Sequence, residues 1–239
     1  MKTQDTAVNV DAGEIARFEK LAATWWDTRG EMAPLHSINP PRVAYIERCA
    51  GGLAGKTALD VGCGGGILTE ALAARGATAT GIDLADASLK VAELHGLESG
   101  IKARYRKIAA EELAREQPGS FDLVCCLEML EHVPQPQQTI AACAQLAKAG
   151  GDVVFSTINR NPKAYALAIL GAEYVMNLIP RGTHDYAKFI RPSELDRWAR
   201  AAGLDVLDLR GLRYNPLLKT ASLADDVDVN YLMHCRKPA

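Results

Sequence analysis

The chain has 239 residues, 48% of them hydrophobic, and a formal net charge of −2 with acidic and basic residues interspersed. This length predicts one substantial core and a single domain over 1–239, and the absence of a basic stripe argues against a nucleic-acid partner. No apolar run reaches the roughly 18 residues of a membrane span, the first residues lack the apolar core of a secretory signal, and six cysteines without a C-x-x-C pair indicate reduced thiols in a cytoplasmic protein.

Residues 1–50 are predicted to form an N-terminal helical extension. Asp11 can cap a first helix. One face of that helix carries four apolar residues, Ile15, Phe18, Ala22 and Trp25. A second helix is predicted to start after the proline pair of PPRVAYIERCAGG and to end at the glycine pair 51–52.

From residue 56 onward, buried strands alternate with helices. The predicted strands are 56–61, 77–83, 102–107, 121–127 and 151–157, and the predicted helices are 67–75, 86–99 and 136–148. Such units predict an α/β, doubly wound, Rossmann-like sheet that is mostly parallel, with helices on both faces. The alternation breaks at 158–190, a predicted helical insertion. It resumes with a helix over 191–203 and two strands, 204–214 and 228–237, expected to pair antiparallel at one sheet edge.

A glycine-rich turn, LDVGCGGGIL, joins the first strand to the first helix of the alternation. Gly62 and Gly64 let the backbone turn tightly and let a ligand approach without a clash. The G-x-G-x-G spacing differs from the G-x-G-x-x-G dinucleotide fingerprint, and the lysine of a P-loop is absent. An ordinary strand–helix turn is the alternative, but so many glycines weaken a helix start unless something must come close.

Asp83 ends the second strand, 21 residues after Gly62. A carboxylate at this place can accept hydrogen bonds from both ribose hydroxyls of an adenosine ligand, although it can also cap the following helix. The glycine turn, the strand-end acid and the α/β alternation together resemble the S-adenosylmethionine-dependent methyltransferases. In that fold the end of the fourth strand borders the methyl-transfer centre.

Longer segments point to a more specific family, and the resemblance to it extends from about residue 15 to residue 234. ATWWDTRGEMAPLHSINPPRVAYI, EMLEHVPQP, FSTINRNPKAYALAILGAEY, PRGTHDYAKFI and DVNYLMH are similar to the ubiquinone-biosynthesis O-methyltransferases. The resemblance implies methylation of two hydroxyls of a polyprenylated ring, one on a polyprenyl catechol and one on a demethylated ubiquinol. It places cofactor contacts at Arg42, Gly62, Asp83 and Leu127. Arg42 is expected to meet the methionine carboxylate, unless it is only a helix-surface arginine, and Leu127 stands where many relatives have methionine.

The segment LEMLEHVPQP at the end of the fourth strand offers two routes for removing the acceptor proton. His132 is the candidate general base. Alternatively, Glu128, Glu131 and His132 hold a divalent cation, magnesium or manganese with zinc also open, if the chain turns helical after Leu127. The resemblance, more than the spacing, favours this metal site, with magnesium as the expected ion. Glu131 and His132 can also simply cap and orient the loop before VPQP.

The insertion contains the apolar run 164–180, with one charged residue and basic residues on both sides. Either it covers the active site as a buried helix, or it lies in a membrane interface, since it is too short to span. The membrane-bound polyprenyl tail of the implied substrate favours docking. We therefore expect a cytoplasmic protein peripherally associated with the inner face of the membrane, with anionic lipid and other ubiquinone-biosynthesis proteins as partners.

The sequence thus predicts an S-adenosylmethionine-dependent O-methyltransferase acting on quinone precursors. Two alternatives remain open at this point. One is a different small-molecule phenol methyltransferase of the same fold. The other is a catalytically silent, cofactor-binding scaffold in a lipid-associated complex, against which the intact Gly62, Asp83 and acidic strand end argue.

Overall fold

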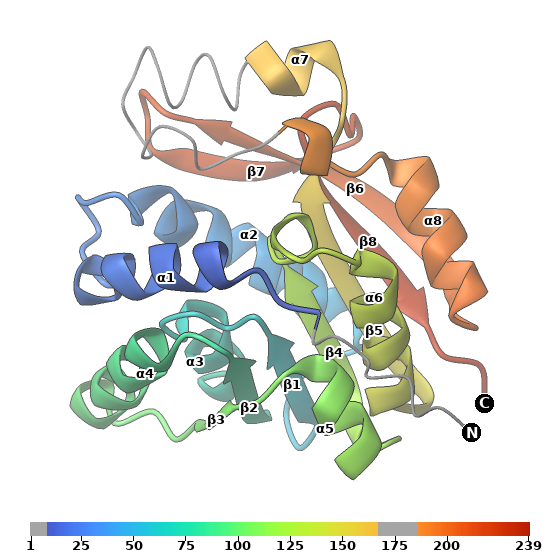
Figure 1. The fold of residues 1–239 in the computed structure, drawn as a ribbon, viewed down its shortest axis with the longest axis horizontal. Coiled ribbons are helices and arrows are strands. Elements are labelled where there is room, and N and C mark those ends of the chain that lie inside the picture. Colours follow the sequence, from blue (N-terminus) through green and yellow to red (C-terminus); the bar gives the residue numbers. More distant parts are fainter. Residues whose placement is uncertain (1–8, 167–185) are drawn as a thin grey trace.

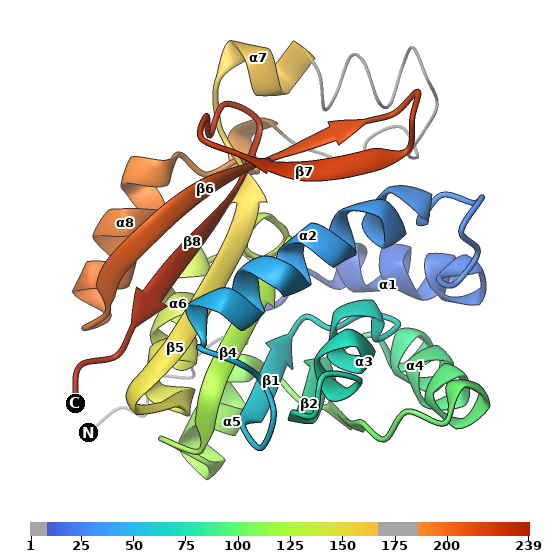
Figure 2. The same ribbon diagram turned by 180° about the vertical axis from the view of Figure 1, so that it is seen from behind.

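The computed structural model describes residues 9–166 and 186–239. Within these ranges eight strands form one sheet in the order β3-β2-β1-β4-β5-β8-β6-β7, and helices lie on both of its faces (Figure 1, Figure 2). The strands are β1 (Thr57–Val61), β2 (Thr78–Asp83), β3 (Arg104–Lys107), β4 (Phe121–Leu127), β5 (Ala147–Ile158), β6 (Asp205–Asn215), β7 (Thr220–Ala224) and β8 (Asn230–Arg236).

Helices connect the strands and precede them. The α-helices are α1 (Ala12–Leu21), α2 (Ala33–Cys49), α3 (Ile67–Ala73), α4 (Asp86–Ser99), α5 (Ala110–Glu116), α6 (Pro136–Leu146), α7 (Pro162–Ala164) and α8 (Pro192–Ala201). Short 3₁₀ turns lie at η1 (Ala22–Thr24), η2 (Leu130–His132) and η4 (Tyr186–Lys188). Asp11 caps α1 as predicted, because its side chain accepts hydrogen bonds from the amides of Gly13 and Glu14.

The strand directions confirm the predicted class. The first five strands pair in parallel, whereas β8 lies antiparallel between β5 and β6. The expected antiparallel pair β6–β8 is therefore present. It does not close the sheet edge, because β7 adds a further antiparallel strand outside β6.

Alternate residues of the central strands enter two separate cores. Val124 and Cys126 of β4 pack with α5, α6 and α8, whereas Leu123 and Cys125 pack with α2 and α3. Successive side chains of a strand point to opposite faces, so a strand covered on both faces must be apolar throughout. This explains the continuous apolar run LVCCL at residues 123–127 of β4. All six cysteines are free thiols, as expected.

The second helix begins earlier than predicted. α2 starts at Ala33 and holds Pro40 and Pro41 in its interior, so the expectation of a start after the prolines is wrong. An interior proline removes an amide donor and crowds the preceding turn, which normally ends a helix. Here Tyr45 and Ile46 are buried against the sheet, and this packing outweighs the local preference.

Two elements, α5 and β7, are absent from the predicted set. α5 has its buried residues Ala110, Leu113 and Ala114 at helical spacing, but it is only seven residues long. β7 is a five-residue edge strand that pairs with β6 alone, so tertiary pairing rather than local pattern determines it. No helix among the described residues is long and apolar enough to cross a membrane.

A buried ion cluster joins two strands, β5 and β8, at the sheet's antiparallel side. Asp152 of β5 contacts His234 Nε2 at 2.9 Å and Arg236 Nη2 at 2.8 Å, both on β8. Burial disfavours the charged imidazole, but hydrogen bonds with Asp152 and Cys49 outweigh it and raise the pKa of His234 to about 9. Burial alone would raise the pKa of Asp152, yet its two partners lower it.

We expect His234→Gln to flatten the dependence of unfolding free energy on pH. An imidazole whose pKa rises from about 6.5 in the unfolded chain to about 9 in the fold stabilises the protein fully below pH 6.5. That contribution disappears as the pH rises through 9. Urea unfolding at intervals from pH 6 to 10 measures the slope. An equal slope in the parent and in His234→Gln would contradict the assignment.

Candidate functional site

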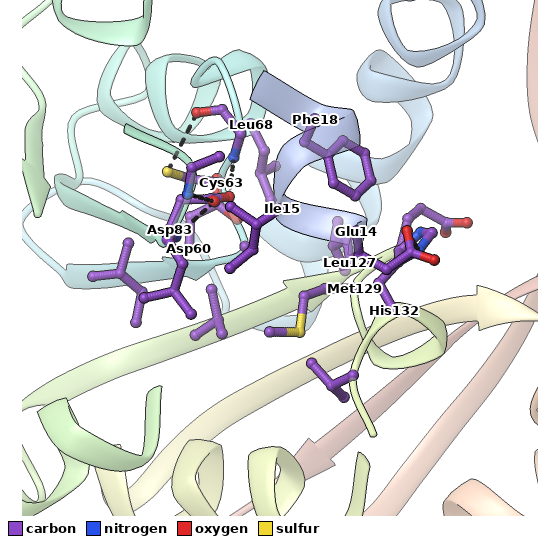
Figure 3. Close-up of a pocket in the computed structure, with 18 of the residues that line it drawn as sticks. Glu14, Ile15, Phe18, Asp60, Cys63, Leu68, Asp83, Leu127, Met129 and His132 are labelled. Atoms are coloured by element: carbon purple, nitrogen blue, oxygen red, sulfur yellow. Dashed lines mark hydrogen bonds and ion pairs between the residues drawn. The ribbon is translucent and has the colours of Figure 1, made fainter. Parts of the chain in front are cut away.

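A pocket of about 360 Å³ lies where the carboxyl ends of the parallel strands meet the N-terminal helices. Its walls come from α1, α2, the glycine turn after β1, and the residues that follow β2 and β4. Among its apolar lining residues are Ile15, Phe18, Met32, Leu35, Ile38, Leu127 and Met129. Figure 3 shows two polar ends separated by apolar side chains, with Asp60 and Asp83 at one and Glu14 and His132 at the other.

The glycine turn forms the floor of the first end. Gly62 and Gly64 have φ angles of 73° and 50°, which favour glycine. A Cβ at Gly62 would lie 2.5 Å from Met129 Cγ, and one at Gly64 would collide with the Trp25 ring. Both glycines are thus required by backbone conformation and by close neighbours, as predicted, although the neighbours here are protein side chains.

Asp83 holds the turn after β2 in place. Its Oδ2 accepts a hydrogen bond from the Gly64 amide at 2.9 Å, and its Oδ1 accepts from the amides of Leu84 and Ala85 at 2.7 and 2.8 Å. Burial raises the pKa of this carboxyl despite the three amides. Two carboxylate oxygens offer about four acceptor positions, so the side chain retains capacity for a ligand hydroxyl. The residues fit the predicted ribose contact.

Asp60 is an acid of the site that the motif reading did not assign. It is 3% exposed, and its Oδ2 accepts a hydrogen bond from the Thr69 hydroxyl at 2.7 Å. Burial raises the pKa of Asp60 to about 7, against the effect of Thr69. The signal was its place at the end of β1, directly before the glycine turn. Its pairing with Thr69 makes it a support of that turn.

Arg42 reaches the pocket from α2 and is 5% exposed. Its Nη2 donates to Glu128 Oε1 at 2.6 Å, while its buried Nε has no hydrogen-bond partner among the described residues. Glu128 also accepts hydrogen bonds from Ser156 of β5 and from Asn230 of β8, the latter at 2.8 Å. Arg42 is therefore no surface arginine. Its orphaned donor fits the predicted contact with a carboxylate.

Glu131 and His132 lie in η2, just after β4. The carboxylate of Glu131 accepts a hydrogen bond from the Thr157 hydroxyl at 2.8 Å. Burial and the charge of Glu128 raise the pKa of Glu131 to about 7. Its buried side chain anchors η2 to β5, which leaves His132 at the pocket wall.

Glu14 of α1 is the site residue that sequence reasoning missed. Its Oε2 contacts His132 Nδ1 at 3.2 Å, and the Phe18 ring meets the imidazole edge-on at 5.1 Å between centroids. The contact with His132 lowers the pKa of Glu14 to about 2, against the effect of burial. The two residues are 118 positions apart, so the one available sequence signal was the position of Glu14 one turn before Phe18 on the apolar face of α1.

The predicted metal ligands do not converge. Glu128 has a φ of 52° and Met129 one of −124°, so Glu128 is not on one helical face with Glu131 and His132. Each of the three side chains contacts a different protein partner. Across 9–166 and 186–239 no three such side chains form a group able to hold a metal ion. The arrangement described does not fit a bound cation.

The apolar run 164–180 lies mostly outside the described residues. Of the basic residues around it, Arg160 pairs with Glu194, and Lys163 pairs with Asp228 at 2.7 Å. Lys188 lies 3.4 Å from Glu14 Oε1. These cations therefore already have acidic partners within the protein.

Comparisons with known proteins identify the chain's relatives. A family model described as a methyltransferase domain matches residues 39–209. A ubiquinone biosynthesis O-methyltransferase of Pseudomonas paraeruginosa is 62% identical over 97% of this chain and 99% of its own length. One of Saccharophagus degradans is 61% identical over 99% of this chain and 100% of its own. The magnesium protoporphyrin IX methyltransferase of Synechocystis, solved with SAH, aligns at a TM-score of 0.68 and 16% identity over 93% of this chain and 94% of that one, which confirms the fold alone.

Asp83→Ala is expected to weaken binding of S-adenosylhomocysteine by about 1–3 kcal/mol, because ribose hydroxyls lose their acceptor. Isothermal titration calorimetry measures the affinity. Asp86→Ala is the matched control, since Asp86 is an exposed acid three residues later that pairs with Lys90. Equal affinities of the parent and Asp83→Ala would remove Asp83 from the cofactor site.

Proposed function

The chain belongs to the ubiquinone biosynthesis O-methyltransferases, which depend on S-adenosylmethionine, and from this premise we propose that it methylates ring hydroxyls of polyprenylated catechol and demethylubiquinol intermediates. The observation that best supports this reaction is the shared pocket. One of its ends carries the glycine turn and Asp83, and the other carries an imidazole held by a carboxylate.

At the first end, the chain's own residues suit the methyl donor. We propose that Asp83 binds the ribose hydroxyls, that Gly62 and Gly64 allow the backbone to approach, and that Arg42 binds the carboxylate. Leu127 lines the pocket beside them and suits an adenine face. When bound, S-adenosylmethionine supplies an electrophilic methyl group on a sulfonium.

At the second end, His132 is suited to take the proton of the acceptor hydroxyl. A phenol of this kind is mostly protonated at pH 7, by analogy with tyrosine. Because Glu14 contacts Nδ1 of His132, the proton of a neutral imidazole stays on that nitrogen and Nε2 is free to accept another. His132 would thus hold the proton of the acceptor hydroxyl, while the methyl group would come from the donor bound at the first end.

A divalent cation bound by Glu128, Glu131 and His132 is the alternative route. It requires Glu128 to leave Arg42, Ser156 and Asn230, and His132 to leave Glu14. Separating Arg42 from Glu128 would leave a buried guanidinium unpaired, which is costly. The present contacts therefore favour the general base, and magnesium dependence remains a prediction.

The tail of the proposed substrate sets a further requirement. Each tail CH₂ that leaves an apolar environment for water costs about 0.8 kcal/mol, so we propose that the enzyme works peripherally at the inner face of the membrane rather than extracting its substrate. The apolar run 164–180 is the sequence feature that supports this. Anionic lipid and other proteins of the same biosynthesis are the partners we propose.

His132→Gln is expected to lower kcat by about 10²–10⁴-fold, the usual contribution of a general base. Glu14→Gln should lower kcat about tenfold or more with little change in KM, because it removes the group that orients the imidazole. Both are measured by transfer of a labelled methyl group to a short-tailed catechol. Glu19→Gln, an exposed position on the same helix, is the control and should match the parent.

A chelator separates the two routes in the same assay. Proton transfer to His132 predicts full activity of the parent after thorough removal of divalent cations. Activity lost with chelator and restored by magnesium or manganese, with unchanged cofactor affinity, would contradict the general-base route. Full activity in both variants would remove the Glu14–His132 pair from the reaction.

A further inference from the structure

The turn between β6 and β7 presents a pair of exposed leucines. Leu217 and Leu218 are 89% and 70% exposed, and Leu217 is the most exposed large apolar side chain in the described part of the chain. Scattered single apolar residues on a surface are ordinary, whereas adjacent ones at a projecting tip present a combined apolar surface. We define Leu217, Leu218 and Lys219 as the hairpin tip.

The backbone of the tip is fixed. Asn215 Oδ1 accepts hydrogen bonds from the amides of Leu217 and Leu218 at 3.0 and 3.1 Å. Asn215 pairs with Thr220 across the hairpin, and Pro216 restricts the first turn position. A hydrogen-bonded turn therefore holds the two leucines in place. Their insertion into an apolar environment would cost little conformational entropy, because the backbone is already ordered.

The charges around the tip select its partner. Over 213–222 the only charged residues are Arg213 and Lys219, both exposed and both cationic. Arg213 forms an ion pair with Asp226 at the base of the hairpin. Lys219 directly follows the two leucines in the sequence. An apolar pair with a flanking cation suits the interface of an anionic bilayer, where the leucines enter the acyl boundary and the amine meets the headgroups.

The hairpin is also attached to the pocket wall. β7 packs against α2, whose residues Leu35 and Ile38 line the pocket, and Figure 2 shows β7 running alongside that helix. A bilayer bound at the tip would therefore lie on the side of the protein that carries the α2 wall. An apolar substrate tail could then remain in lipid while the ring enters the pocket.

We propose that the hairpin tip inserts into the interface of anionic membranes, as a contact separate from the run 164–180. The inference rests on the proposed function, since it assumes an acceptor whose tail resides in a bilayer. It assigns part of the membrane affinity to Leu217 and Leu218 themselves and part to the charge of Lys219.

Vesicle flotation of the full chain tests the proposal with phosphatidylglycerol–phosphatidylcholine vesicles. The variant Leu217→Ser/Leu218→Ser should bind about tenfold or more weakly, because two apolar side chains are lost from the interface. Leu94→Ser/Leu97→Ser is the matched control, since these leucines on α4 are 60% and 80% exposed; it should bind like the parent. Lys219→Gln should weaken binding to anionic vesicles and leave binding to neutral ones unchanged.

The outcomes are distinct. Equal vesicle binding by the parent and the tip variant would contradict insertion of the hairpin tip but not membrane docking itself. A parent that binds no vesicles would contradict both membrane docking and insertion of the tip. A tip variant that loses self-association in sedimentation but keeps vesicle binding would assign the leucines to a second copy and overturn the proposal. The tip variant should methylate a short-tailed, water-soluble catechol at the parental rate. Absence of methylation in the parent itself would refute the proposed reaction independently of the tip.

Discussion

A buried positive charge at the end of β4 constrains the whole site. Arg42 is 5% exposed, and a guanidinium in that position is tolerated only with a close anionic partner. Glu128 provides it at 2.6 Å and is itself held by Ser156 of β5 and Asn230 of β8. One ion pair thus fixes α2, β4, β5 and β8 relative to one another. Glu128 makes these contacts from a left-handed backbone conformation, with a φ of 52°.

The N-terminal segment adds walls to the pocket that lies at the edge of the sheet. The sheet supplies Asp83 and the glycine turn, where we propose that the methyl donor binds. α1 adds Glu14 against His132 and an apolar wall, while Trp25 packs over Gly64. Trp26 reinforces this contact, because its indole Nε1 donates to the Gly65 carbonyl at 2.9 Å and its ring stacks on His95. The proposed donor end therefore comes mainly from the sheet and its turns, whereas the proposed acceptor end also needs Glu14 of α1, 118 positions from His132.

The sequence made the fold predictable wherever local pattern and tertiary packing agree. The apolar run of β4, the Asp11 cap and the glycine turn are such places, and all are confirmed. Pro40 and Pro41 show the opposite case, since burial of the residues after them keeps α2 helical across a pattern that normally ends a helix. Gly62, Gly64, Arg42 and Asp83, predicted from the glycine motif and the family resemblance, all line the pocket, and their contacts with a cofactor stay predictions. The Glu14–His132 contact was not predictable, because no periodicity relates residues 118 positions apart. The single helical face predicted for Glu128, Glu131 and His132 is wrong, because the backbones of Glu128 and Met129 depart from helical φ angles.

If Arg42 binds the carboxylate of the methyl donor as proposed, Glu128 must act on the cofactor through its ion pair with Arg42. A double-mutant cycle measured by calorimetry with S-adenosylhomocysteine tests it most directly, using Arg42→Met, Glu128→Gln and the double variant. Residues in one ion-pair network couple by about 0.5–3 kcal/mol. The account predicts that Glu128→Gln changes the affinity when Arg42 is present and has no effect in the Arg42→Met background. An equal effect of Glu128→Gln in both backgrounds would contradict it.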